Sequence, residues 1–533
     1  MCTSTESNSN RLYQLIRTIR DRAQFDHPTG KFGIIETHIS YILLTGHYAY
    51  KFKKPLDLGF LDFTSLERRK FYCEEEIRLN RRLAPDLYIA VVPVTGSEQH
   101  PVIGGNKQAL EYAVKMVQFP EEAELDRIVN TGCLATSHIN ELAMQIATFH
   151  GSVAVDTEQN HFGSPECIRQ QVMLNYSAIR PFIQNDQQSR NRLDKLEAWT
   201  NLTLDQSAGI FRSRKQSGCI RECHGDLHLG NIALYMDKLV IFDSIEFSQA
   251  LRWIDVMSEV AFLVMDLDAH HQNSLAQRFL NANLQITGDY NGLLLLRFYQ
   301  VYRALIRSKV ACIRLSQPGM TQYDQDKEME NCRRYLNLAY DYIQPVRTPL
   351  IITHGLSGSG KTRLSQLLLE NRGAIRIRAD VERKRMHGLR ENDKTRSAVS
   401  SGIYSETSSI NTYKRLAELA RLVLNAGYPV IIDAAFLQRK QRLIFYNIAV
   451  ECGVPFLILD LLADETRLRE RIMERNRKET DASEADPNVL DYQIATQEPL
   501  ETAETTHRII INTSYKLDLP AILYQIHEKI KQE

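Results

Sequence analysis

Apolar and polar residues alternate differently in the two parts of this chain. In the first part, short runs of strand-like character surround one stretch with helical spacing, Leu66–Leu83, which ends before Pro85. Residues 136–344 have a mainly helical pattern, interrupted by a strand-rich segment at 220–247. The strands predicted before it are Ile39–Leu44, Ala49–Phe52 and Glu111–Val117. This order, strands and then helices, predicts a mixed α+β domain.

The second part begins after a short connector bracketed by Pro345 and Pro349. Helical stretches there alternate with short apolar strands, which implies a parallel sheet with helices on both faces. The predicted strands are Leu350–Thr353, Ala374–Ile377, Pro429–Ile432, Phe456–Leu461 and Arg508–Ile511. We therefore predict a disordered tail at residues 1–10, an α+β domain at 11–345 and an α/β domain at 349–533.

Composition narrows the class of protein. Of 533 residues, 43% are hydrophobic and 24% charged, which is ordinary for globular domains. The 65 Lys and Arg residues balance the 65 Asp and Glu residues, so net charge favours neither nucleic acid nor an anionic membrane. The polar start does not resemble a signal peptide, no apolar stretch has the length of a membrane helix, and the nine cysteines are scattered. These features predict a cytoplasmic protein with no membrane partner and leave its oligomeric state open.

The strongest motif is a glycine-rich loop directly after the strand Leu350–Thr353. It matches GxxxxGK[ST] at every fixed position and lies between a strand and a helix, the context its function requires. Such loops wrap backbone N–H groups round phosphates, while the lysine contacts the β and γ phosphates and the hydroxyl ligates Mg²⁺. The loop therefore predicts binding of magnesium with ATP or GTP. Its residues are Gly355, Leu356, Ser357, Gly358, Ser359, Gly360, Lys361 and Thr362.

Two acids stand at the ends of neighbouring predicted strands. Asp380 follows Ala374–Ile377, where it is placed to take a proton from a substrate hydroxyl. Asp433 follows Pro429–Ile432 and suits an indirect contact with magnesium. Strand-end aspartates also serve as caps or turns. Beside a P-loop, we favour the functional interpretation for both.

Three arginines recur every four residues on one predicted helix and so share a face. Such a row can form a lid that clamps phosphates, or it can be a solvated charged face, because glutamates are interleaved with it. We take Arg471 and Arg475 as candidate nucleotide-binding residues and keep the solvated face as the alternative. The arginines are Arg467, Arg471 and Arg475, and the glutamates are Glu465, Glu470 and Glu474.

From about Leu350 to Thr513 the chain resembles the small P-loop kinases related to phage polynucleotide kinase, chloramphenicol phosphotransferase and zeta-type toxins. In that group the acid after the second strand is typically the general base, and an arginine three residues later binds substrate. Asp380 and Arg383 match these two positions. The stretch 481–486, together with Gln493, resembles a signature of an uncharacterised branch that has no agreed substrate.

A second motif lies in the strand-rich segment at 220–247. His224–Asn231 has an acid, four residues and then an asparagine, the spacing of a kinase catalytic loop. Asp226 would accept the proton of the acceptor hydroxyl, and Asn231 would hold a metal. Asp243 ends the next predicted strand and takes the place of the metal-binding acid of the DFG triplet, which here reads Asp-Ser-Ile. The alternative is a polar turn without function.

A kinase also needs a lysine that contacts the α and β phosphates and a glutamate that orients it. Lys51, on a predicted strand, and Glu76, on the helix that follows, have the required order and separation. The alternatives are Lys53 and Lys54 for the lysine, and Glu74 and Glu75 for the glutamate. No GxGxxG loop precedes Lys51, so the residues that cover the phosphates are not indicated.

From roughly Phe32 to Val310 the chain resembles the aminoglycoside phosphotransferase and choline kinase group. The whole chain is similar to the bacterial bifunctional aminoglycoside phosphotransferase/ATP-binding proteins. The resemblance implies a protein-kinase-like N-terminal domain fused to a C-terminal P-loop NTPase domain. It also implies two ATP- and Mg²⁺-dependent sites that phosphorylate hydroxyl groups of small molecules. The alternatives are a nucleotide-binding regulator with one inactive module and a nucleic-acid 5′-kinase, which the zero net charge disfavours.

We expect the N-terminal acceptor to be a hydroxylated metabolite rather than an aminoglycoside. A polycation needs several convergent carboxylates. The acids after Asp243 are separated by apolar residues and form no dense cluster in the sequence, although two of them share a helical face. They include Asp255, Glu259, Asp266 and Asp268.

Overall fold

The computed structural model describes residues 2–23, 25–59, 61–156, 160–317, 319–395, 402–478 and 482–532. Contacts between residues divide it into two compact units. The first holds residues 1–270 and 298–343, and the second holds 271–297 and 344–533. This division differs from the predicted one in the segment 271–297. Neither end of that segment carries a cluster of proline or glycine, so the sequence did not indicate its bounds.

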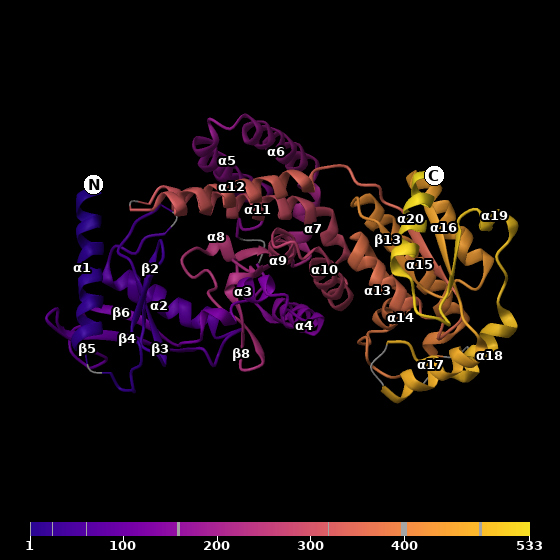
Figure 1. Cartoon of the computed structure of the whole chain (residues 1–533), viewed down its shortest axis with the longest axis horizontal. Helices are drawn as coiled ribbons and strands as arrows, with labels where there is room; N and C mark the ends of the chain where they lie inside the picture. Colours follow the sequence, from indigo (N-terminus) through magenta and orange to yellow (C-terminus); the bar gives the residue numbers. More distant parts are fainter. Residues whose placement is uncertain are drawn as a thin grey trace. The chain divides into compact units, whose positions relative to one another are not determined.

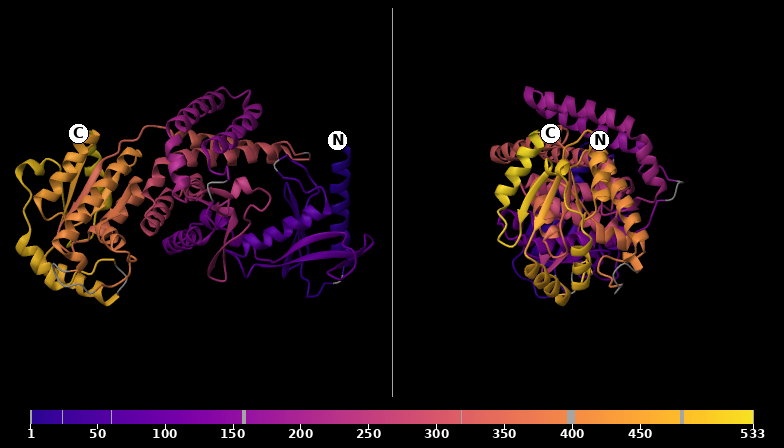
Figure 2. Two further views of the ribbon diagram at one scale, coloured as in Figure 1. Left: turned by 180° about the vertical axis from the view of Figure 1, so that it is seen from behind. Right: turned by 90° about the vertical axis from the view of Figure 1, so that its right-hand side faces the viewer.

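The first unit begins with helix α1 (Cys2–Arg22) and a six-stranded antiparallel sheet in the order β1-β2-β3-β6-β4-β5. Leu12, Leu15, Ile16 and Ile19 of α1 are buried against this sheet, beside which α1 stands in Figures 1 and 2. Residues 2–10, for which the sequence predicts a disordered tail, are drawn as the first part of this helix, and the predicted disorder stays a prediction. No proline or glycine interrupts α1, so the helix anchored by its buried later turns extends back to Cys2. The strands are β1 (Gly33–Glu36), β2 (Ser40–Leu44), β3 (Tyr48–Lys53), β4 (Tyr88–Ser97), β5 (His100–Ile103) and β6 (Glu111–Val117).

Helix α2 (Leu66–Asn80) packs on β4 and β6 of this sheet. It starts at Ser65, whose side chain accepts a hydrogen bond from the backbone N–H of Arg68. Its buried positions include Glu76 and Asn80, so the inner face of this helix is partly polar. The strands and the helix predicted between residues 39 and 117 are confirmed, with ends shifted by a few residues.

A helical region and two small antiparallel ribbons complete the first unit. One ribbon pairs β7 (Ile220–Glu222) with β10 (Trp253–Asp255), and the other pairs β8 (Ile232–Tyr235) with β9 (Lys238–Ile241). The segment 223–231 connects these ribbons. The helices are α3 (Leu125–Asn130), α4 (Thr136–Ser152), α5 (Pro165–Ile179), α6 (Gln187–Gln206), α7 (Ala208–Gln216), α8 (Gln249–Arg252), α9 (Val256–Ala269), α11 (Leu293–Leu315) and α12 (Gln322–Tyr342). Helix α11 belongs to this unit from Phe298 onward.

The second unit contains a five-stranded sheet, parallel throughout, in the order β12-β13-β11-β14-β15. Every residue of β11 and β13 is buried, as expected for strands covered on both faces. This confirms the predicted parallel sheet. The strands are β11 (Leu350–His354), β12 (Ile375–Arg378), β13 (Val430–Asp433), β14 (Phe456–Leu462) and β15 (Arg508–Asn512).

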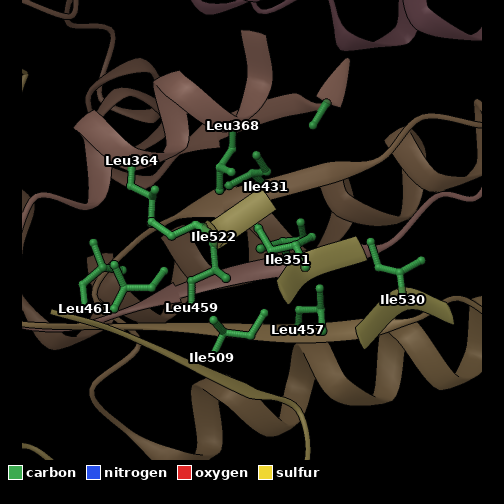
Figure 3. Close-up of a cluster of buried hydrophobic side chains, with 13 residues drawn as sticks. Ile351, Leu364, Leu368, Ile431, Leu457, Leu459, Leu461, Ile509, Ile522 and Ile530 are labelled. Carbon is green, nitrogen blue, oxygen red and sulfur yellow. The ribbon is translucent and has the colours of Figure 1, made fainter. Parts of the chain in front are cut away.

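Helices α13 (Lys361–Arg372) and α20 (Leu519–Gln532) cover one face of that sheet. Figure 3 shows Leu364 and Leu368 of α13 and Ile522 of α20 around Ile351 of the central strand. Helices α15 (Glu406–Asn425) and α16 (Arg439–Cys452) contact the sheet on its other face. The remaining helices are α14 (Ala379–Met386), α17 (Glu465–Lys478), α18 (Pro487–Thr496) and α19 (Thr502–Thr505).

The segment 271–297 adds helix α10 (Asn273–Thr287) to the second unit, where it packs on α13 and reaches the edge strand β12. The side chain of Asn281 takes the place of a neighbouring strand there. It accepts a hydrogen bond from the backbone N–H of Arg376 at 2.7 Å and donates one to the carbonyl of Ala374 at 3.0 Å. None of the described helices is long and apolar enough to cross a membrane.

Candidate active sites

In the first unit, Lys51, Glu76 and Asp243 come together although they are far apart in the sequence. The ammonium of Lys51 lies 2.9 Å from the carboxylate of Glu76 and 2.5 Å from that of Asp243. Burial alone would lower the pKa of Lys51, but the carboxylates of Asp243 and Glu76 outweigh burial and raise it well above its usual value. Lys51 is therefore a fixed cation at this point.

Local structure explains how Asp243 reaches this position. Its backbone is left-handed, with φ of 64°, so the chain turns sharply after β9. The backbone N–H of Asp243 donates to the hydroxyl of Tyr88 at 3.1 Å, and that of Ser244 donates to the side-chain oxygen of Asn80 at 2.8 Å. Because Asn80 is fully buried in α2, it ties this segment to the helix that carries Glu76.

The structure shows which partners bind the alternative lysines and glutamates. Lys54 pairs with Glu36 at 2.6 Å and donates to the carbonyl of Thr37, so it holds the turn between β1 and β2. Glu74 pairs with Lys70 of its own helix, and Glu75 pairs with Arg78 and, at 3.6 Å, with Arg252. Lys53 also contacts Glu76, at 2.7 Å, in addition to Glu246. Of the three glutamates, Glu76 is the one that meets the lysines of β3.

The segment 223–231 brings Asp226 and Asn231 together. The side-chain nitrogen of Asn231 donates to the backbone carbonyl of Asp226 at 2.9 Å and to its carboxylate at 3.2 Å. This leaves the amide oxygen of Asn231 as the atom that can ligate a metal. Nε2 of His228 lies 3.4 Å from the Asp226 carboxylate. Burial raises the pKa of Asp226, but His228 and Arg307 together lower it below its ordinary value, so the carboxylate is ionised.

Buried side chains hold the backbone of this segment in place. The N–H of Gly225 donates to Glu259 of α9 at 2.7 Å, and its carbonyl accepts from Arg303 of α11 at 3.0 Å. The N–H of Leu229 donates to Asp266 at 2.9 Å. Gly225 has φ of 91°, and a Cβ there would lie 2.9 Å from the carbonyl of Leu251. Only glycine fits without strain.

The first unit thus has an antiparallel sheet carrying the lysine, a helix carrying its glutamate partner, a loop with an acid and an asparagine, and an acid after the next ribbon. This is the order and geometry of the protein-kinase-like fold. The predicted fold class of the N-terminal region is confirmed.

In the second unit the glycine-rich loop connects β11 to α13. Gly355, Gly358 and Gly360 have φ of 143°, 82° and 89°. A Cβ on Gly355 would lie 2.6 Å from the carbonyl of Leu461, and one on Gly358 would lie 2.7 Å from that of Leu468. Side chains are therefore excluded at both positions, where the loop packs closely against the backbone of Leu461 and Leu468.

The ammonium of Lys361 donates to the carbonyls of Gly355 and Leu356, each at 2.8 Å, and so stays within the loop. Burial lowers the pKa of Lys361 to about 8, although the carboxylates of Asp433 and Asp380 act in the opposite direction. Asp433 ends β13 and accepts a hydrogen bond from Ser365 at 3.2 Å.

Asp380 lies in the first turn of α14 and accepts a hydrogen bond from Arg383 at 2.7 Å. The guanidinium of Arg383 also lies over the ring of Tyr404, at 4.8 Å from its centre. The predicted base and the predicted substrate residue are thus in direct contact. Both line a cavity of 1320 Å³ that also includes Lys361, Thr362 and Asp433.

The three arginines of α17 differ in their surroundings. Arg467 is exposed and pairs with Glu470 at 3.2 Å. Arg471 donates to the carbonyl of Gly358 in the P-loop and to Thr513, and Arg475 donates to the carbonyl of Ala485. Arg471 and Arg475 both line the 1320 Å³ cavity. The row is therefore split, with two arginines facing the cavity and one facing solvent.

Both sites fit magnesium-ATP by the chemistry of their donors. The P-loop is a backbone cradle with a lysine, and Thr362 and Asp433 offer the oxygen ligands that magnesium prefers. In the first unit, Asp243, with a carboxylate 44% exposed, and the oxygen of Asn231 offer the same kind of ligand.

Comparison with known proteins gives a family match in one part of the chain. The AAA domain family matches residues 350–500, which include the P-loop and the strands β11 to β14. One protein of Mycobacterium bovis and two of Mycobacterium tuberculosis, all uncharacterized, are 26% identical over 452 residues. The match spans 84% of this chain and 87% of each relative.

Two solved structures each resemble a part of the chain. A choline/ethanolamine kinase family protein from Mesorhizobium loti has a TM-score of 0.36 and 10% identity, and the match covers 62% of this chain and 99% of that one. A gluconokinase from Sinorhizobium meliloti has a TM-score of 0.25 and 17% identity, and the match covers 36% of this chain and 94% of that one.

Three residues near the sites were not recognised from the sequence as part of them. Glu246 pairs with Lys53, Tyr88 accepts from the backbone of Asp243, and Gln493 accepts from the N–H of Ser357 in the P-loop at 2.8 Å. Gln493 belongs to the signature around 481–493, of which Asp481 lies outside the described residues. For Glu246 the signal was partial. Strand alternation puts Lys53 on the same face as Lys51, and a buried lysine needs a partner, but no spacing in the sequence identified Glu246 as that partner.

Proposed function

We propose that the chain is an ATP-dependent phosphotransferase with two kinase modules, each of which transfers the γ-phosphate of ATP to a hydroxyl group of a small molecule. The observation that carries this proposal is the contact of Lys51 with both Glu76 and Asp243, next to a loop in which Asn231 hydrogen bonds to Asp226. The P-loop, with Asp380 and Asp433 beside it, supports a second site of the same chemical class.

In the N-terminal module, Asp226 is the proposed general base. It is ionised and half-buried, so it can accept the proton of an acceptor hydroxyl as the oxygen attacks. Lys51 holds the α and β phosphates, and Glu76 fixes the position of Lys51. Asn231 and Asp243 hold magnesium, which supplies charge neutralisation at the phosphates.

In the C-terminal module, Asp380 is the proposed general base and Arg383 the proposed substrate-binding residue. The guanidinium of Arg383 donates a hydrogen bond to the Asp380 carboxylate at 2.7 Å, and both residues line the same cavity as the P-loop lysine. Lys361 contacts the β and γ phosphates, while Thr362 and Asp433 hold magnesium. Arg471 and Arg475 reach the same cavity from α17, where their charge neutralises phosphate oxygens.

The acids near the N-terminal module argue against a polycationic acceptor. The four acids named in the sequence after Asp243 are all engaged with neighbouring groups of the protein. Their partners are Arg214 for Asp255, His150 for Glu259, the N–H of Leu229 for Asp266 and Tyr342 for Asp268. An aminoglycoside site would need free carboxylates. We therefore propose a hydroxylated metabolite as the acceptor of this module.

A phosphorylation screen tests the proposal. The whole protein is incubated with a pool of cell metabolites and ATP labelled on its γ-phosphate. The same screen is run with Asp226→Ala and with Lys361→Ala, so that each labelled product is assigned to one module. Products that disappear with one variant and persist with the other support two kinase sites. Absence of label transfer from the wild type to any metabolite would contradict the proposal.

A second measurement tests the class of acceptor. The protein is expressed in a susceptible bacterium, and the inhibitory concentrations of several aminoglycosides are determined. We expect no change. A large rise that disappears with Asp226→Ala would make the N-terminal module an aminoglycoside kinase.

A further inference from the structure

Beside Lys51 stands a second lysine that shares its glutamate. Lys51 and Lys53 lie two residues apart on β3, so both point to the same face of the sheet. Oε1 of Glu76 lies 2.9 Å from the ammonium of Lys51, and Oε2 lies 2.7 Å from that of Lys53. Glu76 and Lys53 are both fully buried. Each oxygen of this carboxylate is thus held by a different cation.

Lys53 also pairs with Glu246, which is buried and lies three residues after Asp243. The ring of Phe63 lies 5.1 Å from the Lys53 ammonium and closes the site on that side. Arg252 holds the backbone carbonyl of Glu246 at 3.1 Å. The ammonium of Lys53 therefore bridges α2, which carries Glu76, and the segment that carries Asp243.

The charges around these groups explain why a bridge is needed. Two buried carboxylates, those of Glu76 and Glu246, repel each other unless a cation lies between them. Burial and the charge of Glu76 raise the pKa of Glu246, while Lys53 acts against both. Without the positive charge of Lys53, the Glu246 carboxylate would compete with Glu76 for the ammonium of Lys51 and would draw Lys51 away from the phosphates.

We propose that Lys53 is a positioning residue of the N-terminal nucleotide site, which fixes Glu76 and locks it to the Asp243 segment through Glu246. When Lys51 turns to the phosphates of the nucleotide, Lys53 remains as the partner of Glu76. In protein kinases the pairing of the lysine with the glutamate is controlled by movement of the glutamate helix. Here a second lysine holds that helix in the paired position, so the site is assembled without a separate activating step.

This inference rests on the proposed function, because it assumes that the N-terminal module binds magnesium-ATP. The test therefore uses the full chain with Lys361→Ala, which removes the P-loop site, and measures magnesium-ATP affinity by calorimetry. On this background, Lys53→Met is compared with Lys115→Met. Lys115 is also a buried lysine of the same sheet, but it pairs with Asp26, outside the nucleotide site.

We expect Lys53→Met to weaken magnesium-ATP binding about tenfold or more, since it leaves two buried carboxylates with one cation. Lys115→Met should stay within about twofold of the background. Adding Glu246→Gln to Lys53→Met should recover part of the lost affinity, because it removes the carboxylate that the first substitution left unpaired. If the two substitutions acted independently on the structure, their losses of affinity would instead add in the double variant.

Two results would overturn the proposal. One is a magnesium-ATP affinity of Lys53→Met equal to that of the Lys361→Ala background. The other is a further loss of affinity when Glu246→Gln is added to Lys53→Met. If Lys53→Met does not fold, Glu246→Gln alone is measured instead, and an unchanged magnesium-ATP affinity of that variant also overturns the proposal. Asp243→Ala separates this inference from the proposed function. If Asp243→Ala also leaves binding unchanged, the N-terminal module is not a magnesium-ATP site at all. If Asp243→Ala alone weakens binding, the module stands and Lys53 is only structural.

Discussion

The side chain of Asn281 hydrogen bonds to the backbone of Arg376, and through this contact a helix from the middle of the chain completes the edge of the parallel sheet. An edge strand with unpaired backbone groups is a weak point of any sheet. The side chain of Asn281 satisfies two such groups: its oxygen accepts from the N–H of Arg376, and its nitrogen donates to the carbonyl of Ala374, as a neighbouring strand would.

We expect Asn281→Ala to destabilise the second unit, because the N–H of Arg376 and the carbonyl of Ala374 each lose a partner. A buried polar group left without its hydrogen bond costs about 1–3 kcal/mol. Hydrogen exchange of peptides covering 374–378, followed by mass spectrometry, should show faster exchange there. Asn371→Ala is the control, since Asn371 is exposed and bonds only within α13. Equal protection in both variants would contradict this role of Asn281.

Replacement of Asp226 by alanine should abolish phosphotransfer by the N-terminal module and leave its ATP affinity nearly unchanged. Loss of a general base typically costs about 10²–10⁴-fold in rate. The measurement is the rate of label transfer to the acceptor found in the screen, together with calorimetry of ATP. Asp194→Ala, an exposed acid that pairs with Arg180 on the surface, serves as the control. A parallel loss of ATP affinity in Asp226→Ala would make Asp226 a metal ligand instead.

Asp380→Asn should slow phosphotransfer at the P-loop site far more than it weakens ATP binding. The amide keeps the size of the side chain but cannot take up a proton, so a loss of about 10²–10⁴-fold in rate is expected. Steady-state rates and ATP affinity are compared with those of Asp491→Asn, an exposed acid on α18. Unchanged turnover in Asp380→Asn would exclude it as the base.

The split of the arginine row on α17 predicts different effects for neighbouring residues. Arg471→Ala removes contacts with the P-loop carbonyl of Gly358 and with Thr513, and it removes positive charge from the cavity. We expect ATP affinity at this site to fall about tenfold, in the range of a lost charge-assisted contact. Arg467→Ala, one turn away and exposed, should change the affinity less than twofold. Equal effects of the two substitutions would support the solvated-face interpretation.

The pKa of about 8 at Lys361 predicts a pH dependence of nucleotide binding. The protonated form binds phosphates, so affinity at the P-loop site should decrease as pH rises above 8, approaching about tenfold per pH unit. In the Asp243→Ala chain, ATP affinity measured by calorimetry between pH 7.5 and 9.5 reports on the P-loop site alone. The dependence should be absent from the double variant that also carries Lys361→Ala. A flat profile with Lys361 intact would refute the prediction.

Without nucleotide, the same shift acts on stability with the opposite sign. The pKa of Lys361 in the folded unit, about 8, lies below the ordinary lysine value of 10.5. Between these two values the unfolded chain binds more protons than the folded unit, so the stability of the unit rises with pH across that window.

The motifs could be predicted from the sequence because their chemistry depends on short, fixed spacings. The spacing from Asp226 to Asn231 and the P-loop pattern each lie within eight residues, and strand and helix signals flank the P-loop. The parallel sheet was equally predictable, because apolar strands alternate with helices along the chain. These features need no knowledge of distant contacts.

Other features depend on contacts between distant residues and left no local signal. The buried face of α2 includes Glu76 and Asn80, whereas Phe71, an aromatic residue of the predicted helix, is 54% exposed. Hydrophobic spacing failed there, since ion pairs and hydrogen bonds to β3 and to the Asp243 segment make the inner face polar. Likewise, nothing in the composition of 271–297 indicates that it belongs with residues that follow 344.

Because the second unit combines residues 271–297 with residues after 344, the order of synthesis matters for folding. Asn281 leaves the ribosome 93 residues before Ala374, the strand residue that it contacts. At a synthesis rate of about 5–20 residues per second, roughly 5–20 s pass between the synthesis of Asn281 in α10 and that of the strand it contacts. During that interval Phe279, Leu280 and Leu284, all buried in the finished unit, have no sheet to cover. A chain released shortly after residue 345 would keep this apolar surface permanently, and we expect such a fragment to aggregate.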